Sequence, residues 1–212
     1  MNGGMAVSAD ISNKIPPHGL IHNWLGSEAV EGLLRFARSN ESRFEDTTVA
    51  FKEGQGIDRT RRVSKRLQSL GIVESELRGR LDEVLPAMFN RLGNEPFIPS
   101  NIEVEFVVHG DGAFFARHVD TIAHNPDHGG HSRVFSAVYY FNALPKAFSG
   151  GVLRLYSLAA SGQQGTFVDI KPNRDMLIFF PSFFPHEVLP VKCPSGQFLD
   201  SRFAINFWVH RK

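Results

Sequence analysis

The feature that most restricts the fold of this chain is a series of short apolar segments that begins after Pro99. Turn signals separate them, such as Gly110-Asp111-Gly112 and Lys171-Pro172-Asn173, and no helix-length segment intervenes. The predicted strands are 103–108, 114–119, 134–141, 152–156, 166–170, 176–180, 187–191 and 203–209. About eight short strands without intervening helices are typical of a double-stranded β-helix, or jelly roll.

The first part of the chain has helical patterns instead. Residues 1–14 are small and polar and are expected to form a flexible tail. Ser27 is a predicted N-cap for one helix, and Gly93 should end a second helix, which Pro86 should kink or split. We therefore expect a mainly β protein with N-terminal helices, within one structural domain. Residues 15–98 would form a helical buttress with the first strands, and residues 99–212 a cupin-like jelly-roll core.

Composition and charge exclude several classes of protein. The 212 residues include 23 Lys and Arg and 22 Asp and Glu, so the net charge of +1 predicts binding to neither nucleic acid nor an anionic membrane. Hydrophobic residues make up 42% of the chain, which is enough for a core. The single cysteine, Cys193, permits no intrachain disulfide. Without a signal-peptide pattern or a membrane-length apolar segment, the chain is expected to be cytoplasmic.

Three residues in aromatic-rich segments could hold a metal ion. His118 and Asp120 lie two residues apart at the end of a predicted strand, so their side chains point to one face. His186 begins another strand, which a jelly roll can bring opposite the first. Two His and one carboxylate on one side of an iron leave the other side open, as in non-haem Fe(II) oxygenases. An isolated His-x-Asp is weak evidence, because a surface His beside a solvated Asp gives the same pattern.

The last predicted strand carries a candidate anchor for an anion. One face of this strand holds Arg202, Ala204, Asn206 and Trp208. Arg202 therefore points either into the barrel or into water. An inward Arg202 requires a buried anion, and a dicarboxylate such as 2-oxoglutarate would supply one through bidentate pairing. The Tyr140 hydroxyl could donate to the same carboxylate, whereas Tyr139 would face the other way.

The segment from His109 to His210 contains stretches that match a known family in order. They are HGDGAFFARHVD, VYYFN, SGGVLRLY, DIKP, DMLIFF, HEVLPV and SRFAINFWV. In these stretches the chain resembles the prolyl-4-hydroxylase-like branch of the Fe(II)- and 2-oxoglutarate-dependent dioxygenases. The similarity is greatest to the hypoxia-inducible-factor prolyl hydroxylases and their small bacterial relatives. It covers about half of the chain, essentially the predicted jelly roll.

The resemblance implies roles for individual residues. The iron ligands would be His118, Asp120 and His186. The 2-oxoglutarate pocket would be formed by Arg202, which pairs with the distal carboxylate, by Tyr140, which assists, and by Leu153. Substrate contacts would include Arg133 and Trp208, with His109 as a further candidate. The family's Tyr ten residues before the first His ligand corresponds to Val108 in this chain.

The resemblance also implies a reaction. Fe(II), 2-oxoglutarate and O2 would be required, ascorbate would act as an activator, and succinate and CO2 would be released as an unactivated C–H bond is hydroxylated. Asp120 favours hydroxylation, because related halogenases carry a small residue there so that chloride can bind. Desaturation or ring chemistry remains an alternative outcome. The substrate would be a small molecule, an amino acid or a prolyl peptide.

Two other functions would use the same metal site. A cupin-like metal-binding or sensor protein would hold a metal without oxygenase turnover, but it has no need of a dicarboxylate anchor such as Arg202. An AlkB-like nucleic-acid demethylase would carry a second Arg shortly after the first on the same strand. This chain has Asn206 and Trp208 on that face instead.

Two polar clusters lie outside the predicted site. The loop 121–132 contains His124, His128 and His131, which we expect to be solvated at the cavity mouth rather than bound to a metal. The basic cluster 59–66 contains Arg59, Arg61, Arg62, Lys65 and Arg66. Its ordinary interpretation is a solvated face, and the alternative is a binding site for an acidic partner or an anionic substrate.

Overall fold

The computed structural model describes residues 15–51, 54–121, 132–158 and 165–212. The predicted tail 1–14 lies outside the described residues, as do His124, His128 and His131 of the His-rich loop. Within the described ranges, no helix is long and apolar enough to cross a membrane.

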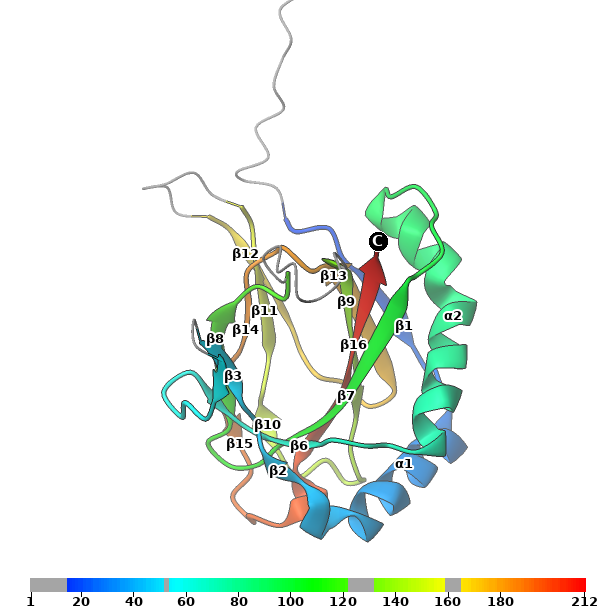
Figure 1. Ribbon diagram of the computed structural model, residues 1–212. Helices are drawn as coiled ribbons and strands as arrows, with labels where there is room; N and C mark the ends of the chain where they lie inside the picture. The colour runs from blue at the N-terminus through cyan, green and yellow to red at the C-terminus, as the bar shows by residue number, and fades with distance from the viewer. Residues whose placement is uncertain (1–14, 52–53, 122–131, 159–164) are drawn as a thin grey trace, which may run out of the picture.

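Two antiparallel sheets that face each other form the centre of the fold (Figure 1). Their strands are β1 (Gly19–His22), β2 (Glu45–Asp46), β5 (Arg62–Val63), β6 (Lys65–Leu67), β7 (Asn101–His109), β8 (Phe114–His118), β9 (Ser132–Phe141), β11 (Leu153–Tyr156), β12 (Phe167–Ile170), β13 (Met176–Pro181), β14 (His186–Val188) and β16 (Arg202–Arg211). The seven-stranded sheet has the order β1-β13-β9-β16-β7-β6-β2, and the five-stranded sheet has the order β12-β11-β14-β8-β5. The predicted double-stranded β-helix with N-terminal helices is confirmed.

Two small two-stranded sheets complete the strands. They are β3 (Val49–Phe51) with β4 (Gly54–Gly56), and β10 (Ser149–Gly150) with β15 (Val191–Lys192). The strand predicted at 187–191 is divided, because β14 ends at Val188 and β15 begins at Val191. Pro190 lies between them and has no N–H for a strand ladder, while its carbonyl accepts the Gly151 N–H at 3.1 Å.

Helices α1 (Ser27–Ser39) and α2 (Ile72–Leu92) cover the outer face of the seven-stranded sheet (Figure 1). Gly26, not the predicted Ser27, is the N-cap of α1, and the Asp175 carboxylate accepts the N–H groups of Leu25 and Gly26 at 2.9 Å. Helix α2 continues through Pro86, so a split there is wrong, and a kink stays a prediction. Pro86 lies on the exposed side of α2, where water can satisfy the carbonyl that loses its partner.

Alternation along β16 decides which side chains enter the space between the sheets. Phe203, Ile205 and Phe207 pack with the helices in the larger apolar core. Arg202 and Asn206 lie on the opposite face and line a cavity between the two sheets. The two-residue period thus places a cation inside the barrel while three aromatic or aliphatic side chains fix the strand from the other side.

The N-terminal segment, residues 15–98, contributes strands to both sheets. It supplies β1, β2 and β6 to the larger sheet and β5 to the smaller one, in addition to the two helices. The division between a buttress of residues 15–98 and a jelly-roll core of residues 99–212 stays a prediction.

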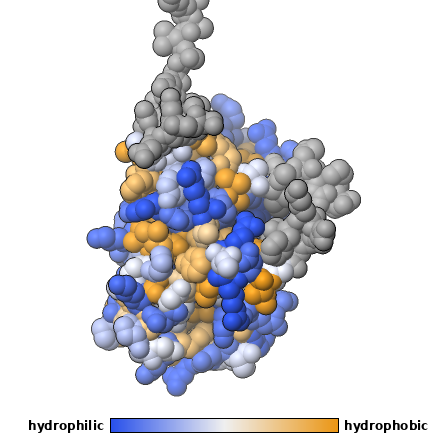
Figure 2. Space-filling view, turned by 90° about the vertical axis from the view of Figure 1, so that its left-hand side faces the viewer, coloured by the Kyte–Doolittle hydropathy of each residue, from blue (hydrophilic) through white to orange (hydrophobic). Residues whose placement is uncertain are grey.

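The outer face of the five-stranded sheet differs from the helix-covered face. Both helices lie on the other side of the molecule (Figure 1), and hydrophilic and hydrophobic side chains are mixed on this side (Figure 2). Arg154 pairs with Asp169 at 2.7 Å on adjacent strands, beneath an exposed Phe167 ring 4.0 Å from the guanidinium carbon. This mixture is typical of an antiparallel sheet that meets solvent on one side.

Candidate metal centre

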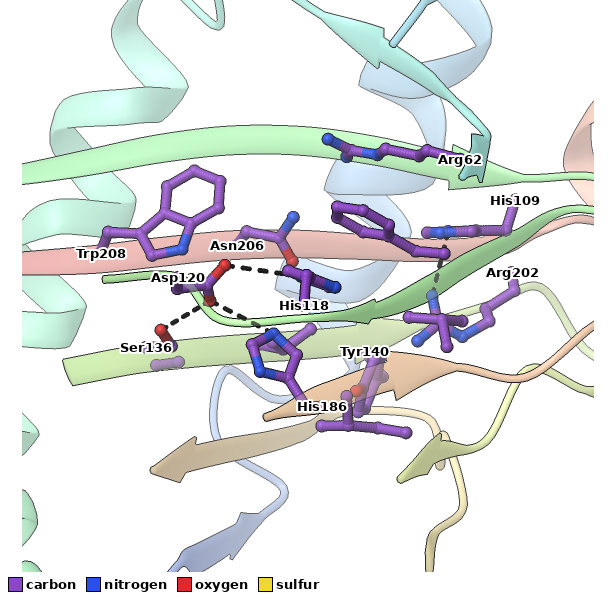
Figure 3. A pocket seen from close by; sticks show the side chains of 15 residues that line it. Arg62, His109, His118, Asp120, Ser136, Tyr140, His186, Arg202, Asn206 and Trp208 are labelled. Carbon is purple, nitrogen blue, oxygen red and sulfur yellow. Dashed lines mark hydrogen bonds and ion pairs between the residues drawn. The ribbon is translucent and has the colours of Figure 1, made fainter. Parts of the chain in front are cut away.

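Three side chains converge between the sheets (Figure 3). His118 ends β8, Asp120 follows it by two residues, and His186 begins β14, which pairs with β8 so that His186 lies opposite His118. His118 Nε2 lies 3.6 Å from Asp120 Oδ1, and His186 Nε2 lies 3.4 Å from Asp120 Oδ2. One candidate ligand atom from each residue lies within 4.8 Å of the others. The residues predicted from sequence are therefore within reach of one ion.

Backbone carbonyls orient both imidazoles. His118 Nδ1 lies 2.8 Å from the Ala116 carbonyl oxygen, and His186 Nδ1 lies 2.9 Å from that of Phe184. Because a carbonyl only accepts, each Nδ1 carries the proton and each Nε2 offers its lone pair to the centre. Two such nitrogens and one carboxylate fit the donor set of a non-haem iron site.

The Asp120 carboxylate is fixed and ionised. Burial acts to raise its pKa, but the charges and hydrogen bonds that His186 and His118 contribute when protonated at Nε2 outweigh burial and hold the pKa well below its usual range. A metal cation at this position would take the place of those protons. Ser136 Oγ donates a hydrogen bond to Asp120 Oδ2 at 2.7 Å. The deprotonated state is the one that a metal ligand requires.

Arg202 is a buried cation in the same cavity, with 1% of its surface exposed. Its Nε donates to the Gly151 carbonyl at 2.9 Å, and its Nη1 donates to His109 Nδ1 at 3.0 Å. Burial lowers the pKa of Arg202 and Tyr140 acts against this, but no carboxylate of the described residues does. A buried guanidinium without an anion is costly, so the cavity is suited to an anion that enters from solution.

Tyr140 adds an unused hydrogen-bonding group to this cavity. Its hydroxyl is buried and has no partner among the residues that the structure describes. The Arg202 guanidinium carbon lies 4.7 Å from the centre of the Tyr140 ring, and Leu153 lines the same cavity. Tyr139 faces the helices, as expected, and donates to Asp175 at 2.9 Å. The three residues predicted for co-substrate binding therefore surround one space.

Comparison with known proteins identifies the family of this chain. A family model described as the 2OG-Fe(II) oxygenase superfamily matches residues 104–210, half of the chain. The chain belongs to this superfamily. An uncharacterized PKHD-type hydroxylase from Synechocystis sp. is 32% identical over 199 residues, which cover 92% of this oxygenase and 63% of the relative. The chain thus spans less than two thirds of that relative's length.

Two solved structures share the fold. A prolyl-4-hydroxylase from Pseudomonas putida has a TM-score of 0.65 and 22% identity, with 93% of this oxygenase and 94% of that chain covered. A prolyl hydroxylase from Trichoplax adhaerens, solved with a hypoxia-inducible-factor peptide fragment, has a TM-score of 0.65 and 24% identity, with 91% and 83% covered. The predicted family and fold are confirmed.

His109, and not its neighbour Val108, points into the cavity. The side chain of Val108 packs in the core beneath the helices, whereas His109 lies opposite Arg202 in the β7–β16 ladder and lines the cavity. Burial, with the charges of Arg202 and Arg62, holds the pKa of His109 well below its usual range. A neutral His109 can accept from Arg202 through Nδ1 while its Nε2–H remains a donor. Although Val108 stands where the family has a Tyr, His109 therefore supplies a polar group to the cavity.

Arg133 and Trp208 lie in the wall of a groove that opens from the metal centre. The guanidinium carbon of Arg133 stacks 4.0 Å from the centre of the Trp208 ring, and Arg133 also pairs with Glu103. His210 Nε2 approaches the same Glu103 carboxylate at 2.6 Å. Both predicted substrate contacts are thus near the ligands, and their role as substrate contacts stays a prediction.

An ionic network that no sequence pattern indicated lies beside the metal ligands. Arg62, grouped above with a solvated basic face, is only 9% exposed and pairs with Glu105 at 3.1 Å. Asn206 donates to the same carboxylate at 3.1 Å, and the Arg62 guanidinium lies 4.7 Å from the Phe115 ring. The basic cluster is therefore not one surface. Alternation placed Asn206 on the same face as Arg202 but did not decide whether that face points inward, and no local pattern identified the partner of Asn206.

Proposed function

We propose that this oxygenase is an Fe(II)- and 2-oxoglutarate-dependent hydroxylase in which His118, Asp120 and His186 hold the iron. The observation that carries the proposal is the buried Arg202, which lacks a carboxylate partner in the described residues and shares a cavity with the three ligands. A simple metal-binding jelly roll has no need of this cation. The substrate would be a small molecule, an amino acid or a prolyl peptide.

The chain's own residues would bind and orient the reactants. Arg202 and the Tyr140 hydroxyl would hold the distal carboxylate of 2-oxoglutarate, and Leu153 would exclude water from its carbon chain. Iron, when bound, would supply the O2 chemistry that couples loss of CO2 and formation of succinate to hydroxylation of a C–H bond. Ser136 would keep the Asp120 carboxylate in one orientation.

An anaerobic titration tests this proposal. Addition of 2-oxoglutarate to the Fe(II)-loaded protein without O2 should give a metal-to-ligand charge-transfer absorption band. Under air, with ascorbate to keep iron reduced, the same protein should release succinate. If iron binds but neither the band nor succinate is found, the protein is a metal-binding or sensor protein instead.

Tyr140→Phe should weaken 2-oxoglutarate binding by roughly 10- to 100-fold, since a hydrogen bond to a charged group contributes about 1.5–3 kcal/mol. Thermal stability should not fall, because the hydroxyl that is removed has no partner in the described structure. The measurement is the KM for 2-oxoglutarate together with the melting temperature.

Tyr139→Phe is the matched control for Tyr140→Phe. It removes a hydroxyl that donates to Asp175 at 2.9 Å on the helix side of the sheet. It should lower the free energy of unfolding by about 1 kcal/mol and leave the KM unchanged. The assignment of Tyr140 would be contradicted if the two variants had the same KM.

Gly151→Ala should displace Arg202. A Cβ at this position would lie 2.5 Å from Arg202 Cδ and 2.9 Å from Val191 Cγ2, and the backbone φ is +61°. Overpacking of this kind costs about 1–3 kcal/mol, and the shifted guanidinium should raise the KM for 2-oxoglutarate. Gly196→Ala, at φ +62° with nothing within 4 Å, introduces the backbone strain alone. The comparison requires steady-state kinetics and thermal denaturation of both variants.

A further inference from the structure

An open groove of about 640 Å³ connects the metal centre to the surface. His118 and Asp120 form part of its wall, and Trp208 lies beside them. The cations in its wall are Arg61, Arg62, Arg66, Arg78 and Arg133. Five guanidinium groups thus lie in the wall of a groove that reaches the metal centre, and only those without a close partner can bind an anion from solution.

Most of these cations already have partners. Besides Asp120, three carboxylates line the groove, and each of these three is engaged by an arginine. The pairs are Glu105 with Arg62 at 3.1 Å, Glu74 with Arg78 at 2.7 Å, and Glu103 with Arg133. These pairs neutralise one another, so they do not by themselves select an anion.

Two cations remain: Arg61, which is exposed, and Arg66, which is half-buried and whose charge is not matched by a close partner in the described residues. The Nη1 of Arg66 lies 3.7 Å from Glu105, a carboxylate that already accepts hydrogen bonds from Arg62 and Asn206. Its Nε is buried without a hydrogen bond in the described part of the chain, and its side chain is 29% exposed. A guanidinium with five donors and no hydrogen-bonded anion can take a carboxylate through two parallel bonds.

The position of Arg66 relates it to the metal ligands. Arg66 lies opposite Val107 in the β6–β7 ladder. Through Glu105 it adjoins Arg62, whose guanidinium lies 4.7 Å from the Phe115 ring, and that ring stacks 3.6 Å from the His118 imidazole. Arg66, His118 and Asp120 line the same groove, so a molecule in it can extend from the metal centre to Arg66.

We propose that Arg66 binds a carboxylate of the substrate, so that the oxidised C–H bond belongs to a carboxylate-bearing molecule. This inference rests on the proposed hydroxylase function and names its substrate class. A polyphosphate would need several unpaired cations, but Arg62, Arg78 and Arg133 are already paired with glutamates. A single carboxylate instead matches the planar fork of Arg66. The free α-carboxylate of an amino acid and an acidic side chain of a peptide share this chemistry.

Matched acid and amide probes test the proposal by calorimetry. Protein with Fe(II) and saturating 2-oxoglutarate is kept without O2, so that the Arg202 cavity is filled. The probes are the free L-amino acids and their amides, N-acetyl-L-proline and N-acetyl-L-prolinamide, and prolyl peptides with Glu or Gln beside the proline. At least one acid should bind about 10- to 100-fold more tightly than its amide. The free acids and the peptides distinguish the two sources.

Variants assign the preference to Arg66. Arg66→Gln should abolish the preference for the acid, and Arg66→Lys should keep part of it, because the charge remains without the planar fork. Arg59→Gln is the control, since Arg59 belongs to the same basic cluster but is 73% exposed and pairs with Asp46. It should retain the preference, and all three variants should bind 2-oxoglutarate as the wild type does.

Three results would overturn the proposal: no acid preferred over its amide by protein that binds 2-oxoglutarate normally, a preference that survives in Arg66→Gln, or tighter binding of a single-stranded oligonucleotide than of any acid. The last result would place a nucleic acid in the groove. Failure to bind 2-oxoglutarate, which is measured first, would count against the hydroxylase function itself and is thus distinguished from failure of the carboxylate proposal.

Discussion

His186→Ala should reduce 2-oxoglutarate turnover at least about 1000-fold, which corresponds to roughly 4 kcal/mol. The variant removes one of two imidazole donors and leaves Asp120 with a single His partner at 3.6 Å. Because His186 also holds the pKa of Asp120 low, the protein should bind less iron and the buried carboxylate should be less well stabilised. Iron content after gel filtration and succinate release under air measure the two effects.

An exposed histidine provides the control for His186→Ala. His22→Ala, at an exposed position at the end of β1, should keep wild-type iron content and turnover. If His186→Ala retained the wild-type amount of iron and its turnover, the ligand assignment would be wrong. A loss of turnover with full iron content would instead give His186 a role other than holding the metal.

Arg202→Ala should raise the KM for 2-oxoglutarate at least about 100-fold, because a bidentate charged pair in a dry cavity is lost. Turnover should recover in part at high co-substrate concentration. Wild-type protein should gain about 2.7 kcal/mol of stability at a 2-oxoglutarate concentration 100 times its Kd, and the variant should lose this gain. Steady-state kinetics and thermal denaturation with and without 2-oxoglutarate provide the measurements.

Arg154→Ala is the matched control for Arg202→Ala. Arg154 lies in the five-stranded sheet with a 25% exposed side chain, and its partner Asp169 is on the adjacent strand. The control should change stability slightly, as expected for a partly exposed ion pair, and leave the KM unaffected. Equal 2-oxoglutarate affinities in wild type and Arg202→Ala would disprove the anchor.

Much of the fold could be predicted because its signals are local. Period-two alternation and Gly- or Pro-containing turns located the strands after Pro99, and a two-residue spacing aligned His118 with Asp120. The direction of Arg202 could not be decided in this way, since alternation separates two faces without saying which one is inside. The packing of Phe203 and Ile205 against the helices decided it.

Other features depend on contacts between distant segments. The pairing of Arg62 with Glu105 joins β5 to β7, and nothing within either strand predicts it. The inward position of His109 follows from its register opposite Arg202. Spacing alone matched the family's Tyr to Val108 instead. Continuity of α2 at Pro86 depends on which side of the helix meets solvent. Each of these requires knowledge of the neighbouring element, not only of the local sequence.

The pairing of β8 with β14 has a consequence for how the chain holds together. An ion bound by His118 and His186 would tie two strands far apart in sequence and close the long loop between residues 118 and 186. In the chain-entropy model, closing loops of this size by a covalent bridge stabilises a protein by between about 3 and about 5 kcal/mol. With Cys193 as its single cysteine, the chain can form no such internal bridge. A bound ion would therefore also crosslink these two strands, as disulfides crosslink many secreted proteins.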